Sequence, residues 1–181
     1  MNSAYEVFYG LKSLYFCALQ EGYRNIISLA TPPKLYSMYL IFDTETTGLP
    51  KRFDAPYTDT DNWPRCIQIA WQLHDAMGNV IEHQDYIVKP EGFNIPFDSE
   101  QIHGISTELA MEKGVPLAEV LEKFNKALGK TKFVVGQNLD FDLNIMGAEF
   151  HRLQVKNPLQ ELPSLDTCTE TTANLCQLPG G

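Results

Sequence analysis

The stretch Tyr39–Gly48 constrains the fold of this chain more than any other part of the sequence. It is an apolar run, typical of a buried β-strand, that ends in two carboxylates at alternate positions, Asp43 and Glu45. Because successive strand residues point to opposite faces, both carboxylates project from the same face near the end of the strand. Like charges held this close repel each other unless they share a proton or a cation. The stretch therefore predicts a cation-binding strand end, and the simpler alternative is a solvated strand end with two incidental acids.

A second acidic cluster follows a second apolar run, far along the chain. The run Phe133–Val135 is followed by a glycine, after which a helical pattern begins. Asp140 and Asp142 lie about 200° apart on a helix, so they cannot both face one site. Phe141 is expected to face the core, and the first turns of a helix favour an anion such as Asp142. On its own, the pattern also fits two ordinary charges in a first helical turn.

Together the two clusters resemble the first two exonuclease motifs of the DnaQ-like (DEDD) 3′–5′ exonucleases, and in particular the proofreading exonuclease of the DNA polymerase III epsilon type. The stretch Phe42–Gly48 matches the first motif almost letter for letter. The segment that starts at Asn138 matches the second motif, Asn-x-x-Phe-Asp, which assigns a metal-binding role to Asp142 rather than Asp140. The resemblance covers roughly Met38–Thr167.

Between these motifs, Ile102–Ser106 resembles the family's His-Gly-Ile element. The resemblance implies that His103 lies beside the terminal nucleotide, although a lone histidine is more often structural. One departure is Gln137, which stands where many family members carry a histidine before the second motif. Glutamine keeps the ability to form hydrogen bonds, so this change is expected to be mild.

The resemblance implies hydrolysis of phosphodiester bonds with two divalent cations, Mg²⁺ or Mn²⁺, roughly 4 Å apart. One cation generates the attacking hydroxide, and the other stabilises the leaving 3′-oxygen. Such hard cations prefer oxygen ligands, which explains carboxylates in place of Cys or His. By resemblance, Asp43 bridges both cations, Glu45 binds one of them, and Asp142 completes the catalytic set.

The same resemblance implies nucleic-acid 3′ ends as the substrate, preferably single-stranded DNA, and a DNA polymerase subunit as a partner. The residues that it assigns to substrate binding are Thr44, Thr46, Thr47, Gly48, His103, Asn138 and Phe141. The net charge of −9 argues against broad, nonspecific binding of duplexes, although bound metals reverse the local charge of a nuclease site. A substrate track would use local cations such as Lys51, Arg52 and Lys89, which are equally typical of ordinary surface charge.

The order of the predicted elements is that of an α/β fold. By resemblance, it is a ribonuclease H-like mixed five-stranded sheet flanked by helices, with strand order 3-2-1-4-5 and an antiparallel second strand. The stretch Cys66–Leu73 alternates apolar and polar residues, which predicts a half-buried strand, and Val80–Val88 returns as its hairpin partner. Apolar periodicity predicts an amphipathic helix over Leu117–Leu128, and a brief strand is expected near Leu165.

We expect residues 38–181 to form the exonuclease domain and residues 1–37 to be an N-terminal extension. The favoured interpretation of the extension is translation from an upstream start, and the alternative is an accessory helix, since Phe8–Leu19 has the spacing of a short amphipathic helix. It contains no recognised motif, so we expect it to be dispensable for the fold.

The third motif of the family supplies a His or Tyr general base and a fourth Asp on a last helix. The residues that follow Asp142 contain no match to it. His151 is interpreted as a solvated helix histidine, and Asp166 as an ordinary acid at a strand end. The domain is therefore expected to be truncated at its C-terminal end, without its last helix, and weak or inactive alone.

The cysteines and the lengths of the apolar runs limit where the protein is expected to be located. Four cysteines show neither zinc spacing nor a paired framework, which suits a reducing cytoplasm. No apolar run approaches the roughly 20 residues needed to span a bilayer, so no membrane partner is expected. The leading interpretation is a cytoplasmic, metal-dependent 3′–5′ exonuclease. The alternatives are a non-catalytic ribonuclease H-like binding module and an inactive fragment, and the joint presence of Asp43, Glu45 and Asp142 weighs against the module.

Overall fold

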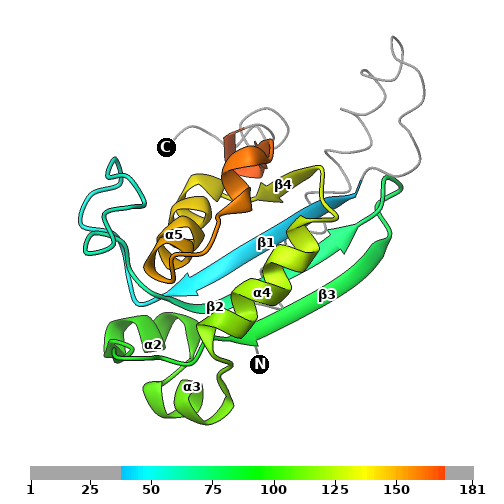
Figure 1. The fold of residues 1–181 in the computed structure, drawn as a ribbon. Coiled ribbons are helices and arrows are strands. Elements are labelled where there is room, and N and C mark those ends of the chain that lie inside the picture. The colour runs from blue at the N-terminus through cyan, green and yellow to red at the C-terminus, as the bar shows by residue number, and fades with distance from the viewer. Residues whose placement is uncertain (1–37, 170–181) are drawn as a thin grey trace, which may run out of the picture.

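A computed structural model describes residues 38–169 and places a mixed five-stranded sheet at the centre, in the order β3-β2-β1-β4-β5 (Figure 1). β1 pairs antiparallel with β2 and parallel with β4, so the predicted strand order and the antiparallel second strand are confirmed. The strands are β1 (Tyr39–Thr46), β2 (Cys66–His74), β3 (Val80–Ile87), β4 (Phe133–Gly136) and β5 (Ser164–Asp166). The helices are α2 (Phe97–His103), α3 (Thr107–Lys113), α4 (Leu117–Leu128), α5 (Leu139–Arg152) and the 3₁₀ helix η1 (Pro158–Glu161).

The central strand β1 has different neighbours on its two faces. Figure 1 shows α4 and α5 lying across one face of the sheet, with α2 and α3 gathered at the end where β1 finishes. Leu40 and Phe42 belong to the main core, which they share with α4 and α5, whereas Ile41 lies in a separate small cluster. The alternation of the strand therefore sends Asp43 and Glu45 to the face opposite these two helices.

The prediction of a half-buried second strand is wrong, because all nine residues of β2 are buried. β2 is an interior strand between β1 and β3. Its polar side chains find partners across the sheet: Gln68 Nε2 donates to Asp85 Oδ1 (2.7 Å), and the Gln72 amide contacts ring nitrogens of His74 and His83. Polar side chains with such partners can be buried at low cost.

Helix α4 confirms the amphipathic helix predicted from the apolar periodicity. Its apolar stripe is buried, and Phe124 packs at a tilt against Phe42 and Trp71, with ring centroids 5.4 and 5.3 Å apart. Aromatic pairs of this kind contribute about 1 kcal/mol each beyond the area that they bury. The contacts join β1 and β2 to α4 and so fix the strand that carries the first two carboxylates.

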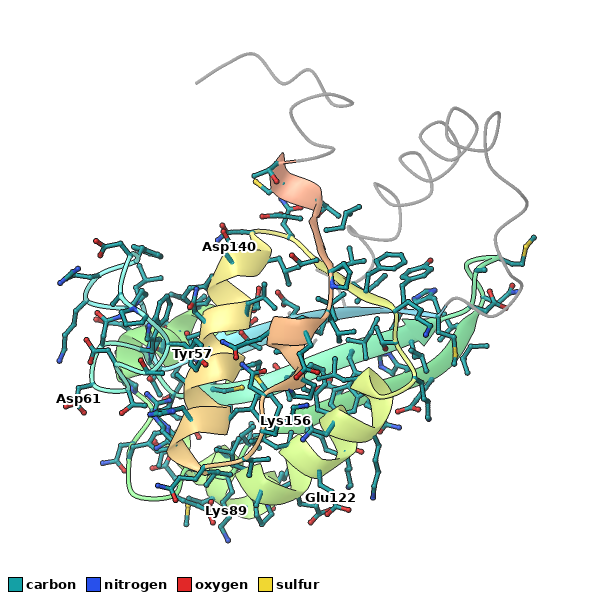
Figure 2. The ribbon with its side chains drawn as sticks, turned by 45° about the horizontal axis from the view of Figure 1, so that its top comes forward. Tyr57, Asp61, Lys89, Glu122, Asp140 and Lys156 are labelled. Carbon is teal, nitrogen blue, oxygen red and sulfur yellow. The ribbon has the colours of Figure 1, made fainter. Side chains whose placement is uncertain are left out.

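The long β1–β2 loop, residues 47–65, lies alongside α5 (Figure 1). Figure 2 shows Tyr57 of this loop beside the helix, where its ring packs on Gly147 and meets the ring of His151 edge-on. Arg152 of α5 donates hydrogen bonds to three backbone carbonyls near the end of the loop, those of Thr60, Trp63 and Pro64. The loop therefore has a defined position on the helix.

Two segments, 1–37 and 170–181, lie outside the described residues, and with them the helix expected over Phe8–Leu19. Within residues 38–169 the order of elements ends at β5, so the last helix of the family is not among the elements described. No helix in this part of the chain is long and apolar enough to cross a membrane.

The contact between Gly147 and Tyr57 provides a test of how the loop packs. A Cβ atom at Gly147 would lie 2.9 Å from Cγ of Tyr57, which is too close unless something shifts. Alanine in a helix interior is normally more stable than glycine by about 0.5–1 kcal/mol. We expect Gly147→Ala to destabilise the fold instead, by about 1–2 kcal/mol, because Tyr57 and its loop must move. Urea unfolding followed by circular dichroism measures the change.

The matched control for this substitution is Gly129→Ala. Gly129 has right-handed helical angles (φ −62°, ψ −18°), and a Cβ atom there meets its nearest neighbour at 3.5 Å. We expect this change to be neutral or stabilising. Equal effects of the two substitutions on the free energy of unfolding would contradict a tight contact at Gly147.

Candidate active site

Asp43 and Glu45 are partly buried near the end of β1. Burial raises the pKa of Asp43 to about 6, although a hydrogen bond from the backbone of Thr44 opposes the shift. Burial, and then the neighbouring charge of Asp43, raises the pKa of Glu45 to about 7. Carboxylates in this state resist ionisation, and a cation placed between them would relieve the repulsion.

Asp142, in the first turns of α5, reaches β1 at Thr44. The backbone N–H of Thr44 donates to Asp142 Oδ1 (3.0 Å), and the Thr44 hydroxyl donates to the same oxygen (2.5 Å). Asp142 is only 3% exposed, and burial, followed by the charge of Asp43, raises its pKa well above the ordinary value. Asp140 is exposed. The structure therefore brings Asp142 to β1 and leaves Asp140 in solvent, as the helical spacing requires.

The turn after β1 is built from residues that the family resemblance assigns to substrate binding. The Thr46 hydroxyl donates to the carbonyl of Gly48 (2.7 Å), and the Thr47 hydroxyl accepts from the backbone N–H of Arg65 (2.9 Å). Gly48 has a φ of +140°, which favours glycine. Both hydroxyls thus shape the turn, and their contact with substrate stays a prediction.

His103 ends α2 and is buried. Its Nδ1 accepts a hydrogen bond from the backbone N–H of Ile105 (3.1 Å), while Nε2 is buried without a partner among the described residues. Desolvation lowers the pKa of His103, so its ring is neutral near pH 7. A buried nitrogen of this kind is consistent with a group that completes its hydrogen bonding on a ligand.

Asn138 and Phe141 lie at the start of α5. Asn138 is exposed with left-handed backbone angles (φ 55°, ψ 44°), and Phe141 packs on the main core, its ring 6.4 Å from that of Trp63. The carboxylate of Asp166 accepts from the backbone N–H groups of Asn138 (2.9 Å) and Leu139 (3.2 Å). The interpretation of Asp166 as an ordinary strand-end acid therefore needs correction, because it caps the helix that carries Asp142.

The sequence interpretation missed a buried ion pair farther along α5. Glu149 has no exposed surface, and Arg65 Nε donates to both of its oxygens (2.9 and 3.3 Å). Arg152 and the backbone N–H of Cys66 add contacts of 3.0 and 2.9 Å. Glu149 follows Asp142 by two helical turns, on the same stripe of the helix. A buried acid needs partners, so its position on this stripe was the signal that could have revealed the pair.

Within residues 38–169, no three His, Cys, Asp or Glu side chains lie close enough together to hold a metal ion. The alternation of β1 explains this, because Asp43 and Glu45 leave one face of the strand and Thr44, which binds Asp142, leaves the other. The donor chemistry nevertheless fits a hard cation, since all three groups are carboxylates. After burial, the charge of Asp43 raises the pKa of both Glu45 and Asp142. A cation bound to Asp43 would therefore relieve its repulsion of both other acids.

The fold and this arrangement of acids define an α/β protein of the ribonuclease H-like class, with paired carboxylates on the central strand. Comparison with known proteins narrows the class to a family. Residues 40–179 match the family described as Exonuclease, so the chain belongs to this exonuclease family. The resemblance to DnaQ-like exonucleases, recognised from the motifs, is thereby confirmed.

The chain is similar to bacterial proteins named DNA polymerase III PolC-type. The protein of Streptococcus thermophilus is 32% identical over 130 residues, which are 71% of this chain and 8% of the relative. That of Lactococcus lactis subsp. lactis is 32% identical over 162 residues, which are 87% of this chain and 9% of the relative. That of Mycoplasma pneumoniae is 28% identical over 180 residues, which are 93% of this chain and 12% of the relative. The chain thus spans about a tenth of the length of these relatives.

Solved structures of E. coli Exonuclease I share the fold. The complex with a dT13 oligonucleotide has a TM-score of 0.64 and 23% sequence identity, and covers 80% of this chain and 31% of that one. The metal-free form of the complex of this exonuclease with single-stranded DNA gives the same values, TM-score 0.64 and 23% identity. At this identity the likeness shows the fold alone.

The raised pKa values predict how stability depends on pH without divalent ions. An acid whose pKa is raised by folding stabilises the fold fully below its unfolded pKa of about 4, and this contribution is lost as the pH rises through the folded pKa. For Asp43 and Glu45 the folded values are about 6 and about 7. The metal-free protein should therefore lose stability between about pH 4 and about pH 7. Asp43→Asn should melt at a higher temperature than the wild type above this range, in thermal unfolding with EDTA.

The control is Asp140→Asn, which removes an exposed acid from the start of α5. It should leave the dependence of melting temperature on pH unchanged. If Asp43→Asn also follows the wild-type profile, then burial of Asp43 does not disfavour its charged form, and the electrostatic description of the site is wrong.

Proposed function

We propose that this chain is the exonuclease domain of a metal-dependent 3′–5′ exonuclease that acts on the ends of single-stranded DNA, in proofreading or trimming. The observation that carries the proposal is electrostatic. Burial and then the charge of Asp43 raise the pKa of both Glu45 and Asp142, so the three acids of the family motifs influence one another electrostatically. Groups with such perturbed pKa values cluster at functional sites, where they transfer protons or bind cations.

Asp43, Glu45 and Asp142 are the proposed catalytic residues and the ligands of two Mg²⁺ or Mn²⁺ ions. When bound, such ions supply an activated water and stabilise charge on the leaving 3′-oxygen. Thr44 orients Asp142 through its backbone N–H and its hydroxyl. The N-terminal end of α5, where Asp142 lies, favours a carboxylate over a neutral acid through the helix dipole.

His103 is proposed to hold an oxygen of the terminal nucleotide. Its Nδ1 accepts the hydrogen bond of the Ile105 N–H, so Nδ1 carries no proton. In a neutral ring the proton then sits on Nε2, which becomes a donor. This donor is the buried nitrogen that lacks a partner among the described residues, and a phosphate or sugar oxygen would supply one.

Exposed apolar side chains beside the site support a single strand as the substrate. Leu49 is 75% exposed, and Phe97 and Ile102 of α2 are 69% and 80% exposed. A Cβ atom at Gly48 would lie 4.0 Å from Oγ of Ser99, so the turn before Leu49 contacts α2. Unpaired bases pack on such side chains, whereas paired bases in a duplex are stacked on one another.

The relatives suggest the setting of this activity. The Exonuclease I structure that shares the fold holds a dT13 oligonucleotide, and the sequence relatives are DNA polymerases III. These observations support single-stranded DNA as the substrate of this chain, a DNA polymerase as its partner, and the cytoplasm as its location.

The direct test is an exonuclease assay with a single-stranded oligonucleotide labelled at its 5′ end, in Mg²⁺ or Mn²⁺. The chain alone should be a poor nuclease, and the shortening that it produces should proceed stepwise from the 3′ end. Asp142→Asn keeps the size of the side chain but loses a metal ligand, so it should reduce the rate by roughly 10²-fold or more. A form that continues into the family's third motif should be faster by about 10²–10⁴-fold, because that motif supplies a general base.

The control in this assay is Asp140→Asn, which should retain the wild-type rate. Binding of the oligonucleotide without any shortening, in the longer form as well, would identify the chain as a non-catalytic binding module instead. Shortening from the 5′ end would contradict the proposed polarity.

Metal binding can be measured separately from catalysis. Isothermal titration calorimetry should detect Mn²⁺ binding to the wild-type chain, and Asp43→Asn should abolish it, since Asp43 acts on both other carboxylates. Binding should release protons from acids whose pKa is near neutral, so the measured heat should change with the ionisation enthalpy of the buffer. Identical titrations for the wild type and Asp43→Asn would remove Asp43 from the ligand set.

A further inference from the structure

The β1–β2 loop is much longer than the connection that two paired antiparallel strands need, which is commonly about 2–5 residues. Its two ends are joined, since Thr47 N–H donates to the carbonyl of Arg65 (3.0 Å) and Arg65 N–H donates to the Thr47 hydroxyl (2.9 Å). Long loops with a defined structure in compact domains commonly carry function. The loop begins at the turn that ends the carboxylate strand, so its first residues lie at the same end of β1 as the candidate active site.

Asn62 fixes the first part of this loop from the inside. Its Oδ1 accepts from the backbone N–H of Arg52 (2.8 Å), and its Nδ2 donates to the carbonyl of the same residue (3.0 Å). The backbone N–H of Lys51 donates to the carbonyl of Asn62 (3.2 Å). With Asn62 buried, the backbone at Lys51 and Arg52 is held in place while their side chains extend into solvent.

The exposed part of the loop combines two cations with an aromatic ring. Lys51 and Arg52 are exposed, and the next residue, Phe53, is 64% exposed. Arg52 donates two hydrogen bonds to Asp54, from Nε to Oδ1 (3.0 Å) and from Nη2 to Oδ2 (3.2 Å), but both side chains are largely exposed, at 70% and 78%. An exposed ion pair of this kind contributes little, at most about 1 kcal/mol, so a phosphate can compete for the guanidinium.

We propose that Lys51, Arg52 and Phe53 form a platform for the nucleotides of single-stranded DNA that lie on the 5′ side of the terminal nucleotide. The inference rests on the proposed function, which places the 3′ end at the carboxylates of β1. From there the strand passes a neighbouring surface, and Figure 1 shows the loop projecting from this end of β1. Cations bind phosphates, and aromatic rings stack with unpaired bases.

Two adjacent cations distinguish the start of the loop from the other neighbouring surface. Helix α2 also lies at this end of β1, but its first turn carries the acids Asp98 and Glu100. These repel phosphates, so α2 suits the apolar packing of a terminal base better than the passage of a phosphate backbone. The loop also carries the acids Asp54, Asp59 and Asp61, so the attraction for a phosphate is confined to its first exposed residues, the adjacent cations Lys51 and Arg52.

Fluorescence anisotropy in EDTA, which prevents cleavage, tests the platform with labelled oligothymidylates of about 12 and about 3 nucleotides. The variant Lys51→Ala/Arg52→Ala/Phe53→Ala should bind the long oligonucleotide about 10-fold or more weakly, and the short one as tightly as the wild type. Loss of two phosphate contacts should reduce the slope of log affinity against log salt by about 1.4. Lys123→Ala/Lys126→Ala removes two cations from α4 and should change neither affinity.

A gain of affinity distinguishes the platform from a general effect of charge. Asp54→Asn releases Arg52 and should tighten binding of the long oligonucleotide by about 2- to 5-fold. Asp61→Asn makes the same change of charge elsewhere in the loop, where Figure 2 shows Asp61 at its outer side, and should have a smaller effect. Equal gains from the two substitutions would contradict a specific role for Arg52.

The outcomes separate the two proposals. If the wild type binds the long oligonucleotide and the triple variant binds it equally, the platform is wrong while the proposed function stands. If the wild type binds neither oligonucleotide, and metal does not restore binding, the proposed function fails and the platform with it. Should the triple variant melt at a lower temperature, Lys51→Gln/Arg52→Gln keeps the aromatic ring and must still show the weaker binding and the reduced salt slope.

Discussion

Two buried acids on one stripe of α5 hold this helix against the sheet, and the candidate site depends on that attachment. Asp142 accepts two hydrogen bonds from Thr44 near the end of β1, and Glu149 is bound by Arg65 and the Cys66 N–H at the start of β2. The helix therefore bridges two strands next to the point where their register shifts. Removing one partner of a buried ion pair typically costs about 3–5 kcal/mol, so the pair of Glu149 with Arg65 fixes the helix firmly.

Glu149 has charged partners, whereas the three acids of the candidate site have none among the described residues. Glu149 is compensated by Arg65 and Arg152. None of the ion pairs found among residues 38–169 involves Asp43, Glu45 or Asp142. An uncompensated group of buried acids destabilises a fold, and such local destabilisation is typical of functional sites, where a ligand later supplies the missing charge. The site therefore differs from the ion pair on the same helix because its acids have no positively charged partner among the described residues.

Local patterns explain which features could be predicted from the sequence. The stripe of α4 and the strand β1 follow from helical and strand periodicity, which neighbouring residues alone determine. Periodicity also shows that Asp140 and Asp142 cannot face one site, and the family motif selects Asp142. Full burial of β2, the cap provided by Asp166 and the partners of Glu149 depend on contacts between distant parts of the chain. A buried Gln68 looks like an exposed one until Asp85 is known to lie beside it. Periodicity cannot supply that information.

The cations near the site show why composition alone is a poor guide to nucleic-acid binding. Arg65 and Arg152 turn inward and neutralise Glu149, and Arg152 also binds carbonyls of the β1–β2 loop. They stabilise the fold and contribute little to the outer surface. Lys51 and Arg52 lie in the same region of the chain but point outward from a backbone that Asn62 already fixes. In sequence the four are equivalent positive charges, and only the structure separates those that hold the loop from those that it presents to a ligand.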